Sequence, residues 1–173
     1  MVASTAAFLR DAPARLARLA AELARAATPP DVAWTLCEFA GRELGLADCV
    51  IYLLDADGAH LTQQAAWGPK RAARRMLESR ITLALGQGIV GRCAQLRLPQ
   101  RTGDARQDRR YVIDDQFNLS ELAVPILAHG VLYGGLDSEH PQAGYYDLDD
   151  EHAFLAIAER GAQRLEALLH ARD

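Results

Sequence analysis

The sequence lacks the features that mark membrane-spanning and nucleic-acid-binding chains. Its 173 residues contain no apolar run that approaches the roughly 18 uninterrupted residues of a membrane-spanning helix. Basic residues are not in excess, because 19 Lys and Arg stand against 23 Asp and Glu. A surface for nucleic acid or an anionic membrane would need clustered positive charge. We therefore expect neither nucleic acid nor a membrane among the partners.

Cysteine is also scarce, and its pattern excludes a disulfide framework. Cys37, Cys49 and Cys93 are odd in number and widely spaced, as expected for free thiols in a reducing cytoplasm. The five histidines show no ligand spacing, so we expect no metal site.

The alanine-rich N-terminus has no compact apolar segment before a cleavage site, which favours a helix of the mature protein over a targeting peptide. Lysine occurs once, as Lys70.

The predicted organisation has an N-terminal helical segment, residues 1–28, followed by one domain, residues 29–173. Between Leu9 and Ala26, leucine and alanine recur at spacings of three and four, with Pro13 expected to open the helix. This stripe is typical of a short coiled-coil seam that would join two chains. It equally fits a helix that covers the domain's own core, and both interpretations stay open at this point.

The domain itself is predicted to be α+β. Thr28 or Asp31 would cap a helix that ends at Gly45, and Asp147 or Asp149 would cap the last helix. Two predicted hairpins lie between these helices, one over residues 49–67 and one over residues 121–137. The order of elements indicates an antiparallel sheet with the terminal helices packed on one face.

The second half of the chain resembles the GAF domain family. The resemblance spans roughly Pro30 to Leu169 and is strongest after Gly86, in segments similar to GAF domains of bacterial sensor histidine kinases. The segments that carry it are Gly86-Gln87-Gly88-Ile89-Val90-Gly91, the loop from Asp104 to Tyr111, Ser120-Glu121-Leu122-Ala123-Val124-Pro125-Ile126, and Asp137-Ser138-Glu139-His140-Pro141. It implies a GAF/PAS-like sheet of five or six antiparallel strands, with helices on one face and a ligand cavity on the other.

The resemblance also implies where a ligand would bind, since the loop before the SELAVPI strand covers the cavity in this family. The ligand-contact candidates are Trp67, Cys93, Asp104, Arg110, Tyr111, Ser120 and Glu121. Arg110 offers a forked donor and Tyr111 an aromatic face. Each candidate also has a competing structural interpretation. The charged loop would pair only with itself, Trp67 would lie at the edge of the core, and Glu121 would bond to nearby backbone amides.

Free methionine-R-sulfoxide reductase is an enzyme of the same fold and similar size, and its thiols are not matched here. Where that family has a cysteine in the glycine motif this chain has Val90, and where it has a second one this chain has Ile113. We therefore expect no catalytic residues and no enzymatic activity. Cys93 precedes Ala94 rather than histidine, which disfavours a covalently bound bilin. The pattern of cyclic-nucleotide-binding GAF domains is not recognisable, and no cofactor is indicated.

The function expected from the sequence is a sensory or regulatory GAF domain of bacterial signal transduction. It would bind a small molecule of unknown identity and relay the signal through its terminal helices, as a homodimer, to a kinase or other output domain. The alternatives are a structural dimerisation module without ligand and, third, a free methionine-R-sulfoxide reductase.

Overall fold

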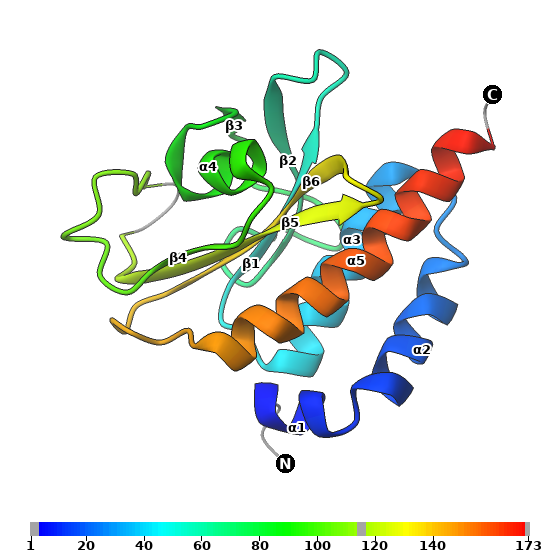
Figure 1. The fold of residues 1–173 in the computed structure, drawn as a ribbon, viewed down its shortest axis with the longest axis horizontal. Helices are drawn as coiled ribbons and strands as arrows, with labels where there is room; N and C mark the ends of the chain where they lie inside the picture. The colour runs from blue at the N-terminus through cyan, green and yellow to red at the C-terminus, as the bar shows by residue number, and fades with distance from the viewer. Residues whose placement is uncertain (1–3, 114–116, 172–173) are drawn as a thin grey trace.

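The computed structural model describes residues 4–113 and 117–171, and it forms one antiparallel sheet with helices on both faces (Figure 1). The helices are α1 (Thr5–Arg10), α2 (Ala12–Leu23), α3 (Pro29–Leu44), α4 (Gly88–Leu96) and α5 (Leu148–His170). The strands are β1 (Cys49–Leu54), β2 (His60–Trp67), β3 (Thr82–Ala84), β4 (Gln100–Thr102), β5 (Ser120–Ala128) and β6 (Val131–His140).

The six strands are ordered β3-β2-β1-β6-β5-β4, and every pair is antiparallel. Two hairpins, β1–β2 and β5–β6, meet where β1 pairs with β6 in the middle of the sheet. The predicted α+β class and antiparallel sheet are confirmed. Among the described residues, no helix is long and apolar enough to cross a membrane.

Local sequence signals set the helix ends. Thr28 caps α3 through a capping box of two reciprocal hydrogen bonds. The Thr28 hydroxyl accepts from the backbone N–H of Asp31, and the Asp31 carboxylate accepts from the backbone N–H of Thr28. Gly45 ends the helix at a φ of 67°, a left-handed conformation that glycine adopts without steric cost. Asp147 caps α5 by accepting from the backbone N–H groups of Asp149 and Asp150. These predicted caps are confirmed.

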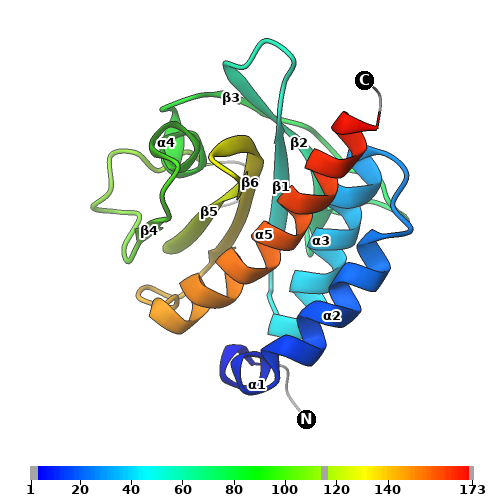
Figure 2. The same ribbon diagram turned by 45° about the vertical axis from the view of Figure 1, so that its right-hand side comes forward.

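The N-terminal helices belong to the domain's own core. Helices α2, α3 and α5 run side by side, with α1 across one end (Figure 2). Phe8 of α1 and Leu19 and Leu23 of α2 are buried in the same cluster as Phe39 of α3 and Phe154 of α5. The leucine and alanine stripe therefore covers the core within one chain, which decides between the two interpretations left open by the sequence.

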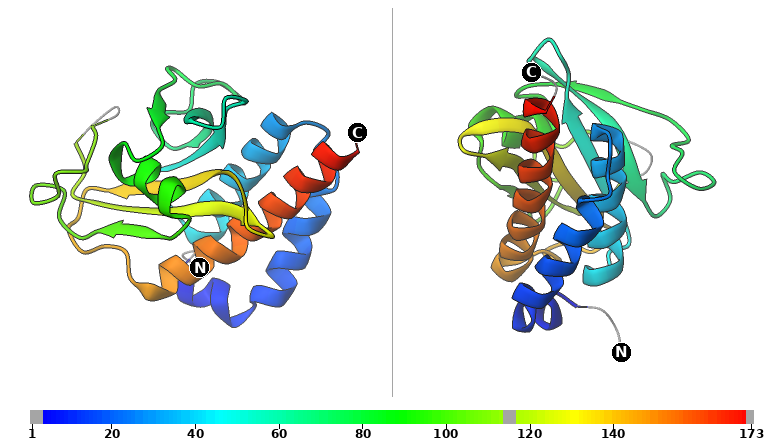
Figure 3. Two further views of the ribbon diagram at one scale, coloured as in Figure 1. Left: turned by 45° about the horizontal axis from the view of Figure 1, so that its top comes forward. Right: turned by 90° about the vertical axis from the view of Figure 1, so that its right-hand side faces the viewer.

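The two faces of the sheet are covered differently (Figure 3). Helices α3 and α5 cover one face over an extensive apolar core that contains Leu36, Ile51, Leu122 and Ile126. Helix α4 and the loops around it cover the other face over a smaller apolar cluster, which includes Val50, Tyr52, Val90 and Cys93. The second face also holds the buried charged groups described next.

Candidate functional site: a buried acidic cluster

Strand register brings three carboxyl groups together on the face opposite α3 and α5. Glu121 of β5 lies directly across from Glu139 of β6, and Asp137 lies two residues before Glu139. Side chains two apart in a strand point to the same face, so these three converge. Leu122 and Leu136, which alternate with them, belong to the helix-side core. Like charges directly across two strands destabilise a sheet, so this arrangement is unfavourable by itself.

Burial makes the arrangement more unfavourable still. Glu121, Asp137 and Glu139 are each 4% exposed or less. Burial raises the pKa of Glu121 and of Asp137 well above the ordinary values, and the neighbouring Glu139 carboxylate raises the Asp137 pKa further. The neighbouring carboxyl groups of Asp137 and Glu139 raise the pKa of Glu121 further. Within the described part of the chain, Glu121 Oε2 and Asp137 Oδ1 are buried without a hydrogen-bond partner.

A single lysine places its positive charge at these carboxyl groups. Lys70 is 7% exposed, and its Nζ lies 3.7 Å from Glu139 Oε2 and 3.9 Å from Asp48 Oδ2. Asp48 comes just before β1 and accepts a hydrogen bond from the backbone N–H of Glu139. We refer to Asp48, Lys70, Glu121, Asp137 and Glu139 as the acidic cluster. Its formal composition is four carboxyl groups to one ammonium.

Polar side chains from the surrounding loops hold the cluster in place. Asn118 donates from Nδ2 to Glu139 Oε2 over 3.1 Å, and its backbone N–H donates to the Tyr111 hydroxyl. On the β1 side, Gln63 donates to the Tyr52 hydroxyl over 2.9 Å. Burial raises the pKa of Tyr111, which therefore stays a neutral phenol. The carboxyl groups are thus positioned by several elements rather than by β5 and β6 alone.

The space among these side chains is almost closed. Its lining residues come from seven parts of the chain: Tyr52, Lys70, Ile81, Leu83, Gly88, Ile89, Val90, Val112, Glu121, Asp137 and Glu139. The free volume is about 10 Å³, enough for at most one water molecule. Gly88 has a φ of 68°, and a Cβ there would lie 3.2 Å from a methyl group of Val112, so α4 approaches the covering loop closely. On the face where the resemblance implies a ligand cavity, the described residues surround a compact chamber with apolar and charged walls.

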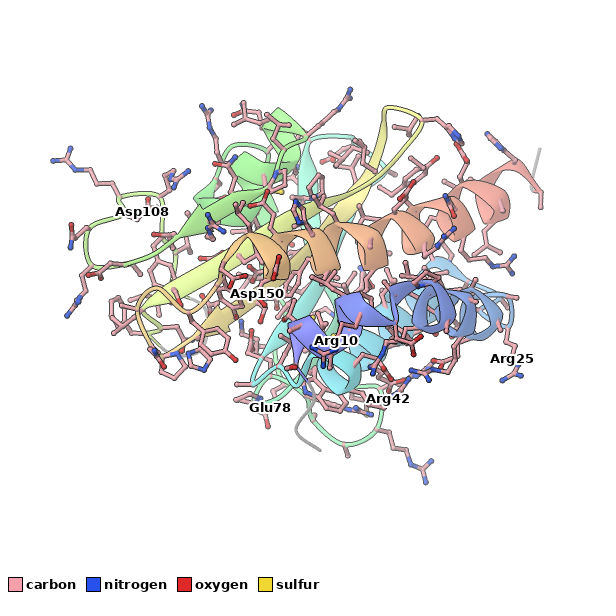
Figure 4. All side chains as sticks on the ribbon, turned by 60° about the horizontal axis from the view of Figure 1, so that its bottom comes forward. Arg10, Arg25, Arg42, Glu78, Asp108 and Asp150 are labelled. Atoms are coloured by element: carbon pink, nitrogen blue, oxygen red, sulfur yellow. The ribbon has the colours of Figure 1, made fainter. Side chains whose placement is uncertain are left out.

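The charged loop before β5 is largely paired with itself. Arg106 donates to Asp104, whose pKa it lowers to about 2, and Arg110 donates to Asp108 over 2.6 Å. Asp108 lies at one end of the molecule, far from Arg25 at the end of α2 (Figure 4). Asp104 and Arg110 therefore have partners within their own loop, as the competing interpretation held.

The remaining sequence-predicted residues have separate positions. Ser120 is buried and donates to the carbonyl oxygen of Gln142. Trp67 packs against the helix-side core and donates to the carbonyl oxygen of Leu46, so it lies away from the acidic cluster. Cys93 is buried in the apolar cluster beside the acidic residues, and burial raises the pKa of its thiol. Glu121 is the predicted residue that lies in the chamber, and Tyr111 contacts its polar frame.

Sequence reasoning did not select Lys70, Asp137 or Glu139. For the two acids a signal existed, because they alternate with Leu136 and Ser138 and would share one face if the predicted strand, which ends at Asp137, continued by two residues. For Lys70 there was none, since it lies in a segment without periodicity between β2 and β3. Among the described residues, no three His, Cys, Asp or Glu side chains are arranged to hold a metal ion.

Comparison with known proteins agrees with this architecture. A family model described as GAF domain matches residues 26–166. A protein described as a GAF sensor from Burkholderia vietnamiensis is 22% identical, with 99% of this chain and 100% of that chain covered and a TM-score of 0.77. The GAF domain of the Acinetobacter phosphoenolpyruvate-protein phosphotransferase is 20% identical, with coverages of 91% and 92% and a TM-score of 0.71. No curated protein matched the sequence.

A third similar structure corrects one prediction. Free methionine-R-sulfoxide reductase from Neisseria meningitidis, in complex with its substrate, is 20% identical over 90% of this chain and 89% of that chain, with a TM-score of 0.75. The prediction that excluded enzymatic activity for this chain is therefore wrong, because enzymes share its fold. The absence of sulfur at Val90 and Ile113 speaks against one arrangement of thiols and not against catalysis in general.

Proposed function

Because the chain belongs to the GAF domain family, a sensory or regulatory role is supported in general, and we propose that its acidic cluster binds a small molecule through a protonated amine. The observation that carries this proposal is the pair of buried carboxyl oxygens, Glu121 Oε2 and Asp137 Oδ1, that have no hydrogen-bond partner among the described residues. Burying a polar atom without a partner costs stability, and the fold of the sheet does not require these acids. A bound cation with several N–H donors would satisfy them.

The chemistry of the cluster favours an ammonium group over other cations. A primary ammonium has three donors and fits acceptors that surround it on several sides. Glu121, Asp137 and Glu139 offer acceptors from two adjacent strands, within a chamber that has apolar walls at Ile89 and Val90. Ligand sites of this kind combine apolar walls with a few orienting polar groups. The ligand is therefore an amine with an apolar or weakly polar remainder, and a free amino acid fits this description.

The similar reductases lend this ligand class chemical support. The enzyme from Neisseria meningitidis is described in complex with its substrate, and free methionine sulfoxide is an amino acid with a primary amine. An amine-binding acidic cluster would suit a sensor of amino acids and also an enzyme that acts on one. Free methionine sulfoxide accordingly belongs among the first compounds to be tested.

Signal relay is the second part of the proposal. The acidic cluster is joined to the helical layer through the sheet, and α1 and the C-terminal end of α5 lie at opposite ends of that layer (Figure 1). A ligand shifts such a protein only if it binds two arrangements with different affinity. We propose that the domain acts as a cytoplasmic homodimer through its terminal helices and that it controls a kinase or another output protein.

The test of ligand binding is calorimetric titration of the full chain with free amino acids, including methionine sulfoxide. Each compound is paired with its analogue that lacks the amine. We expect at least one amine to bind more tightly than about 1 mM and its analogue not to bind. Asp137→Asn should weaken binding at least tenfold, whereas Glu159→Gln, on the exposed side of α5, should not. If no amine binds, the proposal fails and a dimerisation module without ligand is favoured.

The reductase alternative has its own assay. The wild type and Cys93→Ser are incubated with free methionine sulfoxide and a thiol reductant, and methionine is measured. Turnover by the wild type that is lost in Cys93→Ser would assign a thiol-based reductase. Cys93 lies in the apolar cluster beside the acidic residues, whereas Cys37 and Cys49 lie in the helix-side core, so it is the thiol to replace first.

A further inference from the structure

The only lysine of the chain lies inside the proposed ligand site. Its side chain is 7% exposed, and its Nζ lies within 4 Å of Glu139 Oε2 and Asp48 Oδ2. Lysine is rarely buried to this extent unless it is paired. We propose that Lys70 is a tethered occupant of the amine site, whose ammonium fills the position of a ligand's amine until the ligand displaces it. This inference rests on the proposed function of the cluster.

The closed chamber is the first support. Only about 10 Å³ is free while Lys70 is in place, so an amine and the Lys70 ammonium cannot occupy the chamber together. Lys70 also leaves the cluster incompletely satisfied, since Glu121 Oε2 and Asp137 Oδ1 have no partner among the described residues. A ligand that pairs with these oxygens would gain contacts that Lys70 does not make. These additional contacts allow the ligand to displace the Lys70 ammonium, even though the chain itself holds that ammonium at a high local concentration.

The segment that carries Lys70 supplies the second support, because it connects the acidic cluster to α3. Arg71, the next residue, donates to Glu38 of α3 over 3.1 Å, and its guanidinium lies 5.8 Å from the ring centre of Trp34. Arg75 donates to the same Glu38 carboxylate and lies 3.9 Å from Asp31. A withdrawal of Lys70 that also shifts its backbone would move Arg71, since the two are adjacent. The movement would therefore alter the ion pairs that hold this segment on α3.

The backbone of the segment is itself constrained. Arg74 has a φ of 55°, in the left-handed region that non-glycine residues rarely adopt. Arg71 donates to the carbonyl oxygen of Arg74, and the backbone N–H of Glu78 donates to the carbonyl oxygen of Lys70. A conformation of this kind persists only when its contacts maintain it. Loss of the Lys70 contacts would thus favour a second arrangement of residues 68–78.

The experiment replaces Lys70 and returns its amine as a free molecule. Lys70→Ala removes the atoms of an n-propylammonium ion. We expect n-propylammonium chloride to raise the melting temperature of Lys70→Ala and to bind it at least tenfold more tightly than it binds the wild type. Tetramethylammonium, which has no N–H donor, and n-propanol, which has no charge, should have no such effect. Equal binding to both proteins would overturn the proposal.

A matched variant controls for damage to the segment. Arg71→Ala breaks the adjacent contact with Glu38 but leaves Lys70 in place, so n-propylammonium should bind it no better than the wild type. The double variant Lys70→Ala/Asp137→Asn should lose the binding gained by Lys70→Ala. If Lys70→Ala does not fold alone, refolding with n-propylammonium but not with tetramethylammonium supports the proposal, and refolding with neither contradicts it.

Displacement can also be followed in the wild type, because lysine-specific isotope labelling gives one side-chain signal. Titration with an amine that binds the wild type should move the Lys70 Cε signal to that of an exposed lysine. An unmoved signal during binding would overturn the proposal while leaving the amine site intact. Conversely, n-propylammonium could bind Lys70→Ala while no amine binds the wild type. That result would support the proposal that Lys70 occupies the site and would contradict the proposed sensor function.

Discussion

The two faces of the sheet differ in what their burial achieves. The face under α3 and α5 packs Phe39, Phe154, Leu36 and Ile126 into one apolar core. The face under α4 buries Glu121, Asp137, Glu139 and Lys70 beside a smaller apolar cluster. Burial of apolar surface stabilises the fold, whereas burial of carboxyl groups costs stability. One face therefore supplies the stability that permits an unfavourable polar arrangement on the other.

The difference also shows in how polar groups are satisfied. On the helix side, the buried Glu43 carboxylate accepts from Arg15 and lies 2.7 Å from Arg18 Nη2, and the buried atom left without a hydrogen-bond partner among the described residues is a nitrogen, Arg15 Nε. On the α4 side, two carboxyl oxygens have no partner among the described residues. Unsatisfied buried groups in a native protein call for an explanation, and ligand binding is one. Three changes test this contrast between the faces.

The largest effect is expected in the apolar core. Phe154 is fully buried on α5 and contacts Tyr146 edge to face. Phe154→Ala should lower the free energy of unfolding by about 3–5 kcal/mol, measured by urea denaturation, because it removes buried surface and leaves a cavity. Leu169→Ala, at a position 43% exposed on the same helix, should cost less than about 0.5 kcal/mol and serves as the control. Similar losses for both would remove the distinction between the faces.

The acidic cluster should give a smaller effect of opposite sign. The raised pKa of Glu121 means that the folded chain keeps a proton that the unfolded chain loses near its ordinary pKa of 4.5. The folded state then binds more protons, so stability falls as the pH rises from about 4.5 to the raised pKa.

Glu121→Gln stays neutral at every pH and should be more stable than the wild type at pH 8 by roughly 1 kcal/mol, with a shallower loss of stability from pH 5 to pH 8. Part of the slope should remain, because Asp137 still titrates. Urea denaturation at the two pH values measures it, with the exposed Glu159→Gln as control. If Glu121→Gln is less stable than the wild type at pH 8, the negative charge of Glu121 stabilises the cluster and the prediction is wrong.

The smallest effect is expected at the surface loop. Arg106→Ala should raise the pKa of Asp104 from about 2 toward the ordinary 3.8, because the Arg106 side chain is its main hydrogen-bond donor. Carboxyl NMR titration measures this, and the unfolding free energy should not change measurably, since exposed ion pairs contribute little. Arg109→Ala is the matched control and should leave the Asp104 pKa unchanged. A marked loss of stability would indicate that the loop has a structural role.

Much of the fold was predictable because its signals are local. Thr28 and Asp147 act as helix caps through side chains within three residues, and the two hairpins follow from apolar runs around short turns. Glu121 was selected from its position at the start of an apolar strand. Asp104 and Arg110 were selected because the resemblance places their loop over the ligand cavity, but charged neighbours two residues away already pair with them. Residue type alone does not show which partner a side chain has.

The sequence by itself determined the main helices, the two hairpins and the alternation that places Asp137 and Glu139 on one face, because these depend on neighbours along the chain, whereas the register of β5 and β6 adds Glu121 to that face. Only the tertiary structure decided that Lys70 reaches those acids and that the leucine and alanine stripe of α2 covers the core of its own chain. Such contacts join segments far apart in sequence. They depend on the path of the connecting loops and on the competition for buried surface, for which no periodic pattern exists.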